Sequence, residues 1–329
     1  MRTPRFLSPS AISQWVSDRD EYYLRYLADF PPPKIPQSKP MSIGSAFDAY
    51  AKSYLVEKLY GKGMKPEFEF DTIFCSQVDI HNRDWAIVHG KHAFDQYRSS
   101  GALADLMLEL SRADGSPRFE FEVEGRIPHE SVIEGVPLLG KPDLYYKSNV
   151  GAHIIVDWKV NGYCAKTGVT PKKGYVRILD PDKGRDHNHS HKDAHLMRIG
   201  GIDINIAQYF EDVDLDWARQ LVIYGWLLGE PVGSNFLIAV EQLACRPAAI
   251  EFPKIRIASH RGRASEGYQL GLLKQAASIW MSISRGHIFD EMTLEQSQER
   301  QATLDKQYLA YRGDTPQDDW FRQMTRNHD

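Results

Sequence analysis

Two short segments combine carboxylates with an amine at spacings that suit metal-assisted hydrolysis. The first, Gly-Lys-Pro-Asp-Leu, places Asp143 at the start of a β-favouring run, and the second, Ile-Ile-Val-Asp-Trp-Lys, holds Asp157 and Lys159. Alternate side chains of a strand share a face, so Asp157 and Lys159 point one way and Trp158 points the other. Turn-forming residues 148–151 separate the segments, and an antiparallel hairpin would bring Asp143 beside Asp157.

Such a trio suits the hydrolysis of a phosphodiester bond. Two neighbouring carboxylates raise each other's proton affinity unless a cation lies between them. Mg²⁺ prefers oxygen ligands and keeps water in its shell, and Mn²⁺ should substitute for it. Lys159 could orient or help deprotonate a water and stabilise charge that grows on the phosphate. The competing interpretation is a surface Asp–Lys pair worth about 0–1 kcal/mol, but an otherwise apolar strand favours the functional one.

Periodicity predicts an α/β (α+β) fold, with a small mixed central sheet flanked by helices. The expected elements are helices at 8–27, 42–59, 78–97 and 102–111, strands at 119–124, 136–146 and 153–160, a long polar loop at 165–205, a helix at 216–228, strands at 235–242 and 249–258, and a helix at 265–283. We expect one elaborated domain, with a mainly helical part at 1–118, a core at 119–290 and a helical tail at 291–329.

The two motif segments resemble those of a known nuclease family. Gly-Lys-Pro-Asp-Leu-Tyr-Tyr and Ile-Ile-Val-Asp-Trp-Lys-Val are similar to the motifs of the PD-(D/E)XK nucleases, in particular the RecB-like and phage recombination exonuclease branch. The resemblance implies a restriction-endonuclease-like core. It also implies that Asp143, Asp157 and the backbone carbonyl of Trp158 bind the metal and that Lys159 is catalytic.

Three further segments are similar to the same branch. Gln220 and Tyr224 match a Q-x-x-x-Y helix, which would place both near the DNA, although an ordinary amphipathic helix also fits. Leu-Ser-Pro-Ser-Ala-Ile-Ser-Gln-Trp resembles the first helix of the family. Ile-Gly-Ser-Ala-Phe-Asp resembles a G-x-x-x-H motif, with Asp48 where relatives often carry histidine, and we expect Asp48 to be a ligand. One of Glu120, Glu122 and Glu124 could approach the metal; we select Glu124 against the alternative of a solvated strand face.

The polar segment 165–205 allows two interpretations. Its basic residues predict a flap that contacts DNA phosphates without reading sequence. The residues selected for this role are Lys166, Lys172, Lys173 and Arg177. Four histidines between Asp186 and His195 could instead hold zinc. A second basic run, from Arg256 to Arg263, is either a further phosphate contact or a solvated strand end.

Composition limits the class of protein. The chain has 329 residues and a net charge of −4, so it is not a polycation that coats nucleic acid, although a local basic groove remains compatible. The three cysteines lie far apart and do not match the positions of an iron–sulfur cluster, so we expect none. No apolar run is long enough for a membrane span, and the first residues lack a signal-peptide pattern. We therefore expect a cytoplasmic protein of a bacterium or a phage-infected host.

The resemblance implies a Mg²⁺-dependent deoxyribonuclease, and within it an exonuclease acting on DNA ends in recombination, repair or phage DNA processing. A recombination or replication protein would then be a possible partner. Alternatives are a non-catalytic DNA-binding or assembly protein, a structure-specific endonuclease, an RNA-directed nuclease, or a zinc hydrolase centred on the histidines. The sequence leaves the polarity of digestion and the oligomeric state open.

Overall fold

The computed structural model describes residues 1–183, 188–246 and 251–314, with side chains described up to residue 309. The chain forms two compact units. The first, called here the sheet unit, comprises Pro36–Glu122 and Lys141–Gln269. The second, the hairpin unit, comprises Met1–Ile35, Val123–Gly140 and Leu270–Asp329. The predicted division at residue 118 does not coincide with these units, and the prediction of one domain stays a prediction.

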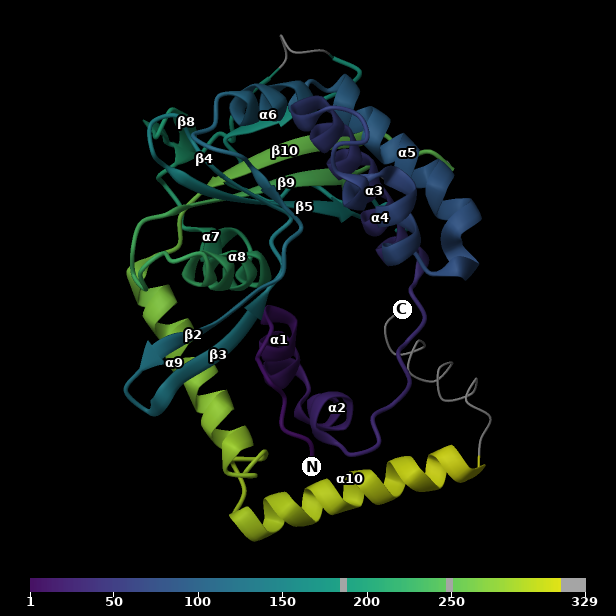
Figure 1. Cartoon of the computed structure of the whole chain (residues 1–329), viewed down its shortest axis with the longest axis vertical. Helices are drawn as coiled ribbons and strands as arrows, with labels where there is room; N and C mark the ends of the chain where they lie inside the picture. The colour runs from purple at the N-terminus through teal and green to yellow at the C-terminus, as the bar shows by residue number, and fades with distance from the viewer. Residues whose placement is uncertain (184–187, 247–250, 315–329) are drawn as a thin grey trace. The chain divides into compact units, whose positions relative to one another are not determined.

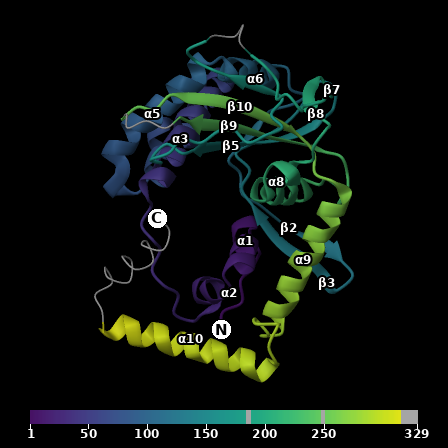
Figure 2. The same ribbon diagram turned by 180° about the vertical axis from the view of Figure 1, so that it is seen from behind.

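The sheet unit is built on a six-stranded mixed sheet, shown in Figures 1 and 2. Its order is β1 (Arg118–Phe119), β4 (Leu144–Lys147), β5 (His153–Asn161), β9 (Leu237–Cys245), β10 (Ile255–Gly262) and β6 (Arg177–Leu179). The β5–β9 pair is parallel and the other pairs are antiparallel. The predicted mixed α/β architecture is confirmed.

Helices cover both faces of this sheet (Figure 1). The helices of the sheet unit are α3 (Lys39–Tyr60), α4 (Phe70–Gln77), α5 (Arg83–Ser99), α6 (Ala102–Ser111), α7 (Phe210–Val213) and α8 (Leu215–Leu227). On one face, Phe47 of α3 and Tyr97 of α5 pack near Trp158. On the other, α8 starts at Asp214, whose side chain caps two backbone N–H groups, and places Trp217 against His260.

The α3–α5 contact is close because α5 carries a glycine where the helices meet. A Cβ atom on Gly90 would lie 2.4 Å from the Cβ of Ala46, well inside van der Waals contact. Small residues at such a crossing let two helix backbones approach. The close packing anchors the segment of α3 that carries Asp48, two residues after Ala46.

The hairpin unit contains a two-stranded hairpin and four further helices. Its elements are α1 (Pro9–Ser17), α2 (Arg19–Tyr22) followed by a π-helical turn (Tyr23–Leu27), β2 (Val123–His129), β3 (Val132–Gly140), α9 (Glu266–Ser284, which begins in the sheet unit) and α10 (Leu294–Asp314). The N-terminal segment joins the hairpin through a parallel bridge between Leu7 and Leu138. Tyr23 donates a 2.8 Å hydrogen bond to Asp305 of α10.

Several predicted elements differ from the structure. The strand expected at 136–146 is divided between β3 and β4, which belong to different sheets, and the strand expected at 249–258 corresponds to β10 at Ile255–Gly262. The helix expected at 8–27 breaks at Asp18, which is extended and caps α2. The strand expected at 119–124 is wrong, because Glu120 has a positive φ of 37° and separates β1 from β2. The loop expected at 165–205 contains β6, β7 (Leu196–Ile199) and β8 (Ile202–Asn205), and β6 pairs with β10. Within the described ranges, no helix combines the length and apolar character needed to cross a membrane.

Candidate active site

Asp143 and Asp157 face each other at the end of the β4–β5 pair. Asp143 immediately precedes β4, and the β4–β5 register pairs Leu144 with Val156. The backbone N–H of Trp158 donates to Asp143 Oδ2 at 3.2 Å, so Asp143 lies against the β5 backbone next to Asp157. Burial raises the pKa of Asp157, and the nearby charge of Asp143 adds to this rise, as expected for neighbouring carboxyl groups. The sequence argument required these two groups to share one side of the sheet, and the structure brings them together.

Lys159 completes the predicted trio from the same strand. Its Nζ atom lies 2.7 Å from Asp157 Oδ2 and donates to Gln220 Oε1 at 2.9 Å. Gln220 in turn donates to Asp157 Oδ1 at 3.0 Å and to the hydroxyl of Tyr224 at 3.0 Å. Gln220 and Tyr224 lie one turn apart on α8. Helix α8 therefore holds the acid and the amine of β5 in a fixed relation.

A second group of side chains reaches Asp143 from α3 and from the β1–β2 connection. Lys52 Nζ lies 2.6 Å from Asp48 Oδ2, 3.0 Å from Glu120 Oε2 and 3.1 Å from Asp143 Oδ1. Gln77, the last residue of α4, donates to Asp48 and to both oxygens of Glu120. We call the set of Asp48, Lys52, Glu120, Asp143, Asp157 and Lys159 the acidic cluster.

The four carboxyl groups of the acidic cluster differ in the direction of their pKa shifts, which depends on whether burial or the nearby amines have the larger effect. Burial, with the charge of Asp143, raises the pKa of Asp157 to about 7, and burial raises that of Asp48 to about 7 against the lowering effect of Lys52. Burial also acts to raise the pKa values of Asp143 and Glu120, but Lys52 and other nearby amines outweigh it, so both pKa values are lowered. Four carboxyl groups thus share the buried amine of Lys52 and the half-buried amine of Lys159.

The lysines stay charged despite their burial. Burial acts to lower the pKa of Lys52, but Asp143, Asp48 and Glu120 outweigh it and raise that pKa. For Lys159, burial also acts to lower the pKa, and Asp157 more than reverses this. Both amines are therefore positive at neutral pH, and they act as fixed cations within the cluster.

The donor set fits a hard divalent cation. Asp48 Oδ1 and Asp157 Oδ2 are buried and have no hydrogen-bond partner among the described residues; Asp157 Oδ2 is close to Lys159 Nζ but without hydrogen-bond geometry. Unpartnered buried carboxylate oxygens are costly in a fold and are suited to Mg²⁺. However, no three His, Cys, Asp or Glu side chains of the described chain already form a metal-binding group. Asp143 and Asp157 could hold an ion together with backbone oxygen if the ion replaced some of their contacts with Lys52, Trp158, Gln220 and Lys159.

The structure selects a different glutamate from the one chosen on sequence. Glu120 lies in the acidic cluster, because its positive φ turns the chain there and its N–H donates to the carbonyl of Asp143. Glu124 is exposed in β2 of the hairpin unit and pairs with Arg5 at 3.0 Å. Lys52 and Gln77 were missed altogether. The signal for Lys52 was its position one turn after Asp48, on a helix whose neighbouring positions are apolar.

The predicted basic flap is only partly a surface feature. Lys166, Lys172 and Lys173 are exposed, and Lys172 pairs with Asp214 at 3.1 Å. Arg177 belongs to β6 and pairs with Asp105 at 2.6 Å, so its prediction as a flap residue is wrong.

The second basic run belongs largely to β10. Within it, Arg261 is nearly buried against Glu109. The predicted surface role therefore fails for Arg261.

The histidine-rich segment does not form a metal-binding group in the part that is described. His191 lies 3.8 Å from Asp193, and the His189 and His191 rings pack edge-on against Tyr175. His187 lies outside the described residues. No His, Cys, Asp or Glu group suited to metal is found among residues 188–195.

Comparisons with known proteins add little to this geometry. No family model matches the chain, and no curated protein matches it significantly. One solved structure that it matches is the shutoff and exonuclease protein from Kaposi's sarcoma-associated herpesvirus, at 10% identity and a TM-score of 0.29, covering 85% of this chain and 92% of that one. Another is a complex of the same virus's SOX protein with RNA, at 12% identity and a TM-score of 0.28, covering 85% and 94%. TM-scores this low do not establish a shared fold.

Proposed function

We propose that this protein is a Mg²⁺-dependent nuclease of the PD-(D/E)XK type that hydrolyses phosphodiester bonds in DNA. The observation that carries the proposal is the convergence of Asp143, Asp157 and Lys159 from paired strands, with two carboxylate oxygens, Asp48 Oδ1 and Asp157 Oδ2, that lack a hydrogen bond among the described residues; Asp157 Oδ2 is ion-paired with Lys159. A structural ion cluster would satisfy those oxygens, because each buried unsatisfied polar atom destabilises the fold. A site for a divalent cation leaves them free.

In this proposal Asp143, Asp157 and the backbone carbonyl of Trp158 hold Mg²⁺, which supplies Lewis acidity and makes a water more acidic. Lys159 is protonated, because Asp157 raises its pKa. We therefore assign it the roles of orienting the attacking water and stabilising charge on the phosphate, and not that of a general base. Gln220 fixes the Lys159 amine through its 2.9 Å hydrogen bond.

Action on DNA ends, in recombination, repair or phage DNA processing, is part of the same proposal and rests on the sequence resemblance. The exposed lysines Lys166, Lys172 and Lys173 are the proposed phosphate contacts. Manganese should replace magnesium, since both accept oxygen ligands.

The test is incubation of end-labelled linear DNA, closed circular DNA and single-stranded RNA with Mg²⁺, Mn²⁺ or a chelator. We expect linear DNA to be degraded with either metal and preserved with the chelator. Degradation of circular DNA at the same rate would remove the end-dependent part of the proposal. Degradation of RNA alone would change the substrate, and no metal-dependent cleavage of any substrate would contradict the proposal itself.

A further inference from the structure

Lys52 is a buried lysine that the mechanism above does not use. Its side chain is 1% exposed, although lysine usually extends its amine to solvent. Its ammonium group has three N–H donors and no acceptor. The three donors meet three carboxylates, those of Asp48, Glu120 and Asp143, at 2.6–3.1 Å. Each acid comes from a different segment, so Lys52 lies at a point where the fold gathers negative charge.

This position is where a second cation would be needed. Without Lys52, the carboxylates of Asp48, Glu120 and Asp143 would be buried within reach of a common point, and like charges at such distances repel strongly. Sites with two metal ions hold them about 3.5–4 Å apart. Asp143 could face two cations here, because Oδ1 contacts Lys52 and Oδ2 faces the β5 backbone beside Asp157.

The surroundings of Lys52 favour an amine over a metal ion at this point. Gln77 donates its amide to Asp48 and Glu120, which supplies hydrogen bonds that a metal ion would not. Lys141 neutralises Glu120 from the solvent side. Among the described residues, no three His, Cys, Asp or Glu side chains are grouped so as to hold an ion, and three of the four acids of the cluster contact Lys52.

We propose that the ammonium group of Lys52 occupies the second cation position of the site, so that the protein binds one divalent ion, between Asp143 and Asp157, and not two. This inference deepens the proposed function and rests on it. It assigns Lys52 a positioning role: the amine holds Asp48, Glu120 and Asp143 in place and supplies a positive charge that does not dissociate.

The test is the number of Mn²⁺ ions bound by the full-length protein without nucleic acid, measured by isothermal titration calorimetry and by electron paramagnetic resonance. We expect one ion for the wild type. Lys52→Met removes the charge at similar volume, and we expect it to bind two ions, with the spectrum of a coupled manganese pair. Lys52→Arg keeps the charge, and we expect it to bind one.

Two further variants test whether the number of bound ions depends on a positive charge at the position of Lys52. Lys141→Met removes an amine that also contacts Glu120 but is 55% exposed, and we expect it to keep one ion. Lys52→Met combined with Asp48→Asn removes one acid of the vacated position, and we expect the count to return to one. Circular dichroism checks the fold of each variant.

Two bound ions in the wild type, or one in folded Lys52→Met, would overturn the inference. If Lys52→Met does not fold, the inference is tested by the number of Mn²⁺ ions bound to the wild type and to the Lys52→Met/Asp48→Asn double variant. The outcomes also separate the two proposals. Nucleic-acid cleavage together with two ions in the wild type would refute only the Lys52 assignment. One ion with no cleavage of any substrate would refute the nuclease proposal and leave the cation count standing. A wild type that binds no ion would refute both.

Discussion

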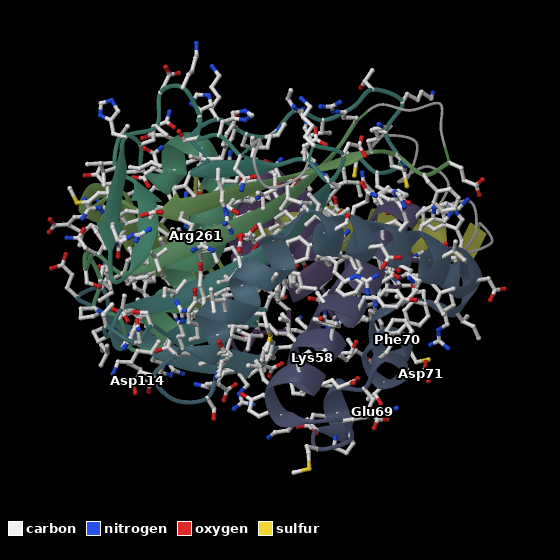
Figure 3. The ribbon with its side chains drawn as sticks, turned by 90° about the horizontal axis from the view of Figure 1, so that it is seen from above. Lys58, Glu69, Phe70, Asp71, Asp114 and Arg261 are labelled. Atoms are coloured by element: carbon white, nitrogen blue, oxygen red, sulfur yellow. The ribbon has the colours of Figure 1, made fainter. Side chains whose placement is uncertain are left out.

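Asp157 and Glu241 lie on opposite faces of the central sheet, each within a cluster of charged side chains, and the two clusters differ in how their carboxylates are satisfied. The register that pairs Trp158 with Glu241 and Asp157 with Val240 places Glu241 and Asp157 on opposite faces. Beside Glu241, Arg261 pairs with Glu109 at 2.7 Å and lies 3.6 Å from Glu241. We call Arg261, Glu109 and Glu241 the arginine cluster; Figure 3 labels Arg261 among the strands.

In the arginine cluster every carboxylate oxygen has a partner. Ser259 donates to both oxygens of Glu241, and Glu109 accepts from Tyr146 at 2.6 Å and from Arg261. In the acidic cluster, Asp48 and Asp157 each keep an oxygen without a hydrogen bond in the described structure. The carboxylates of the arginine cluster are thus satisfied, although Arg261 Nε has no hydrogen-bond partner among the described residues; unsatisfied acids cost stability and are retained where chemistry needs them. The comparison predicts that the two clusters respond differently to substitution.

Asp157→Asn should give the largest effect on activity. It removes a proposed metal ligand, so we expect DNA cleavage to fall by about 10³-fold or more. The folded protein raises the pKa of this carboxyl from 3.8 to about 7. The unfolded chain therefore releases this proton first, so stability is lost as pH rises from 3.8 to about 7 and stays lost above pH 7. At pH 7 the amide should stabilise the metal-free protein by on the order of 1 kcal/mol or more. Cleavage rates and urea unfolding in chelator measure both effects. Activity within tenfold of wild type would mean that Asp157 is not a ligand.

Arg261→Met should show the opposite pattern. It leaves the buried Glu241 and the half-buried Glu109 without their cation, and loss of one partner of a buried ion pair typically destabilises by about 3–5 kcal/mol. We expect a lower urea midpoint, while cleavage per folded molecule stays within about twofold, since Arg261 is on the other face from Asp157. A variant of full stability that had lost cleavage would abolish the distinction between the two clusters.

His260 is a buried histidine on the same face of the sheet as Asp157, and its protonation should cost stability. Burial lowers the pKa of His260 from 6.5 to about 3; Asp214 acts to raise it, and Lys172 and His191 act to lower it. The unfolded chain therefore binds the proton first, and stability is lost as pH falls below about 6.5, by about 2 kcal/mol at pH 5. Urea unfolding of wild type and His260→Gln at pH 7 and pH 5 isolates this loss. Equal losses in both proteins would contradict a neutral buried His260.

Gln220→Ala should weaken the positioning of Lys159 and Asp157 without removing a proposed metal ligand. Gln220 bonds to Lys159, Asp157 and Tyr224, and one lost hydrogen bond to a charged group is worth about 1.5–3 kcal/mol. We expect kcat to fall by at least about tenfold with little change in KM for DNA and in the thermal midpoint. A change in the thermal midpoint alone would make Gln220 a structural residue.

Glu124→Gln should have the smallest effect. Compared with Glu120→Gln, it tests which of the two glutamates affects metal binding. Its exposed pair with Arg5 contributes at most about 1 kcal/mol. We expect cleavage and Mn²⁺ affinity to match wild type, whereas Glu120→Gln should alter Mn²⁺ binding through Lys52. Loss of metal affinity in Glu124→Gln would restore the sequence-based choice.

The part of the site that could be predicted is the part that depends on the pattern of residues close together in the sequence. Strand alternation is a property of adjacent residues, so it identified the shared face of Asp157 and Lys159 without any tertiary information. The choice among the glutamates depended on a backbone turn at Glu120, where φ is positive, which periodicity does not reveal. Lys52 was missed because its burial depends on Glu120 and Asp143, two acids that are distant in sequence.

The same contrast holds for the fold. Helix 102–111 and the strand containing Asp157 were predicted well because each has a strong period of its own. The polar segment 165–205 carries no such period, and β6 forms because β10 offers it a pairing edge. Arg177 is half-buried and forms an ion pair with Asp105 of α6. Composition could not indicate this contact.

The most direct test of the metal site is anomalous X-ray diffraction from crystals soaked in Mn²⁺, with data collected at the manganese edge. We predict one strong peak between the carboxyl groups of Asp143 and Asp157, and none at the position of the Lys52 amine. No peak at the two aspartates, or a single peak among the histidines of residues 188–195, would contradict the account.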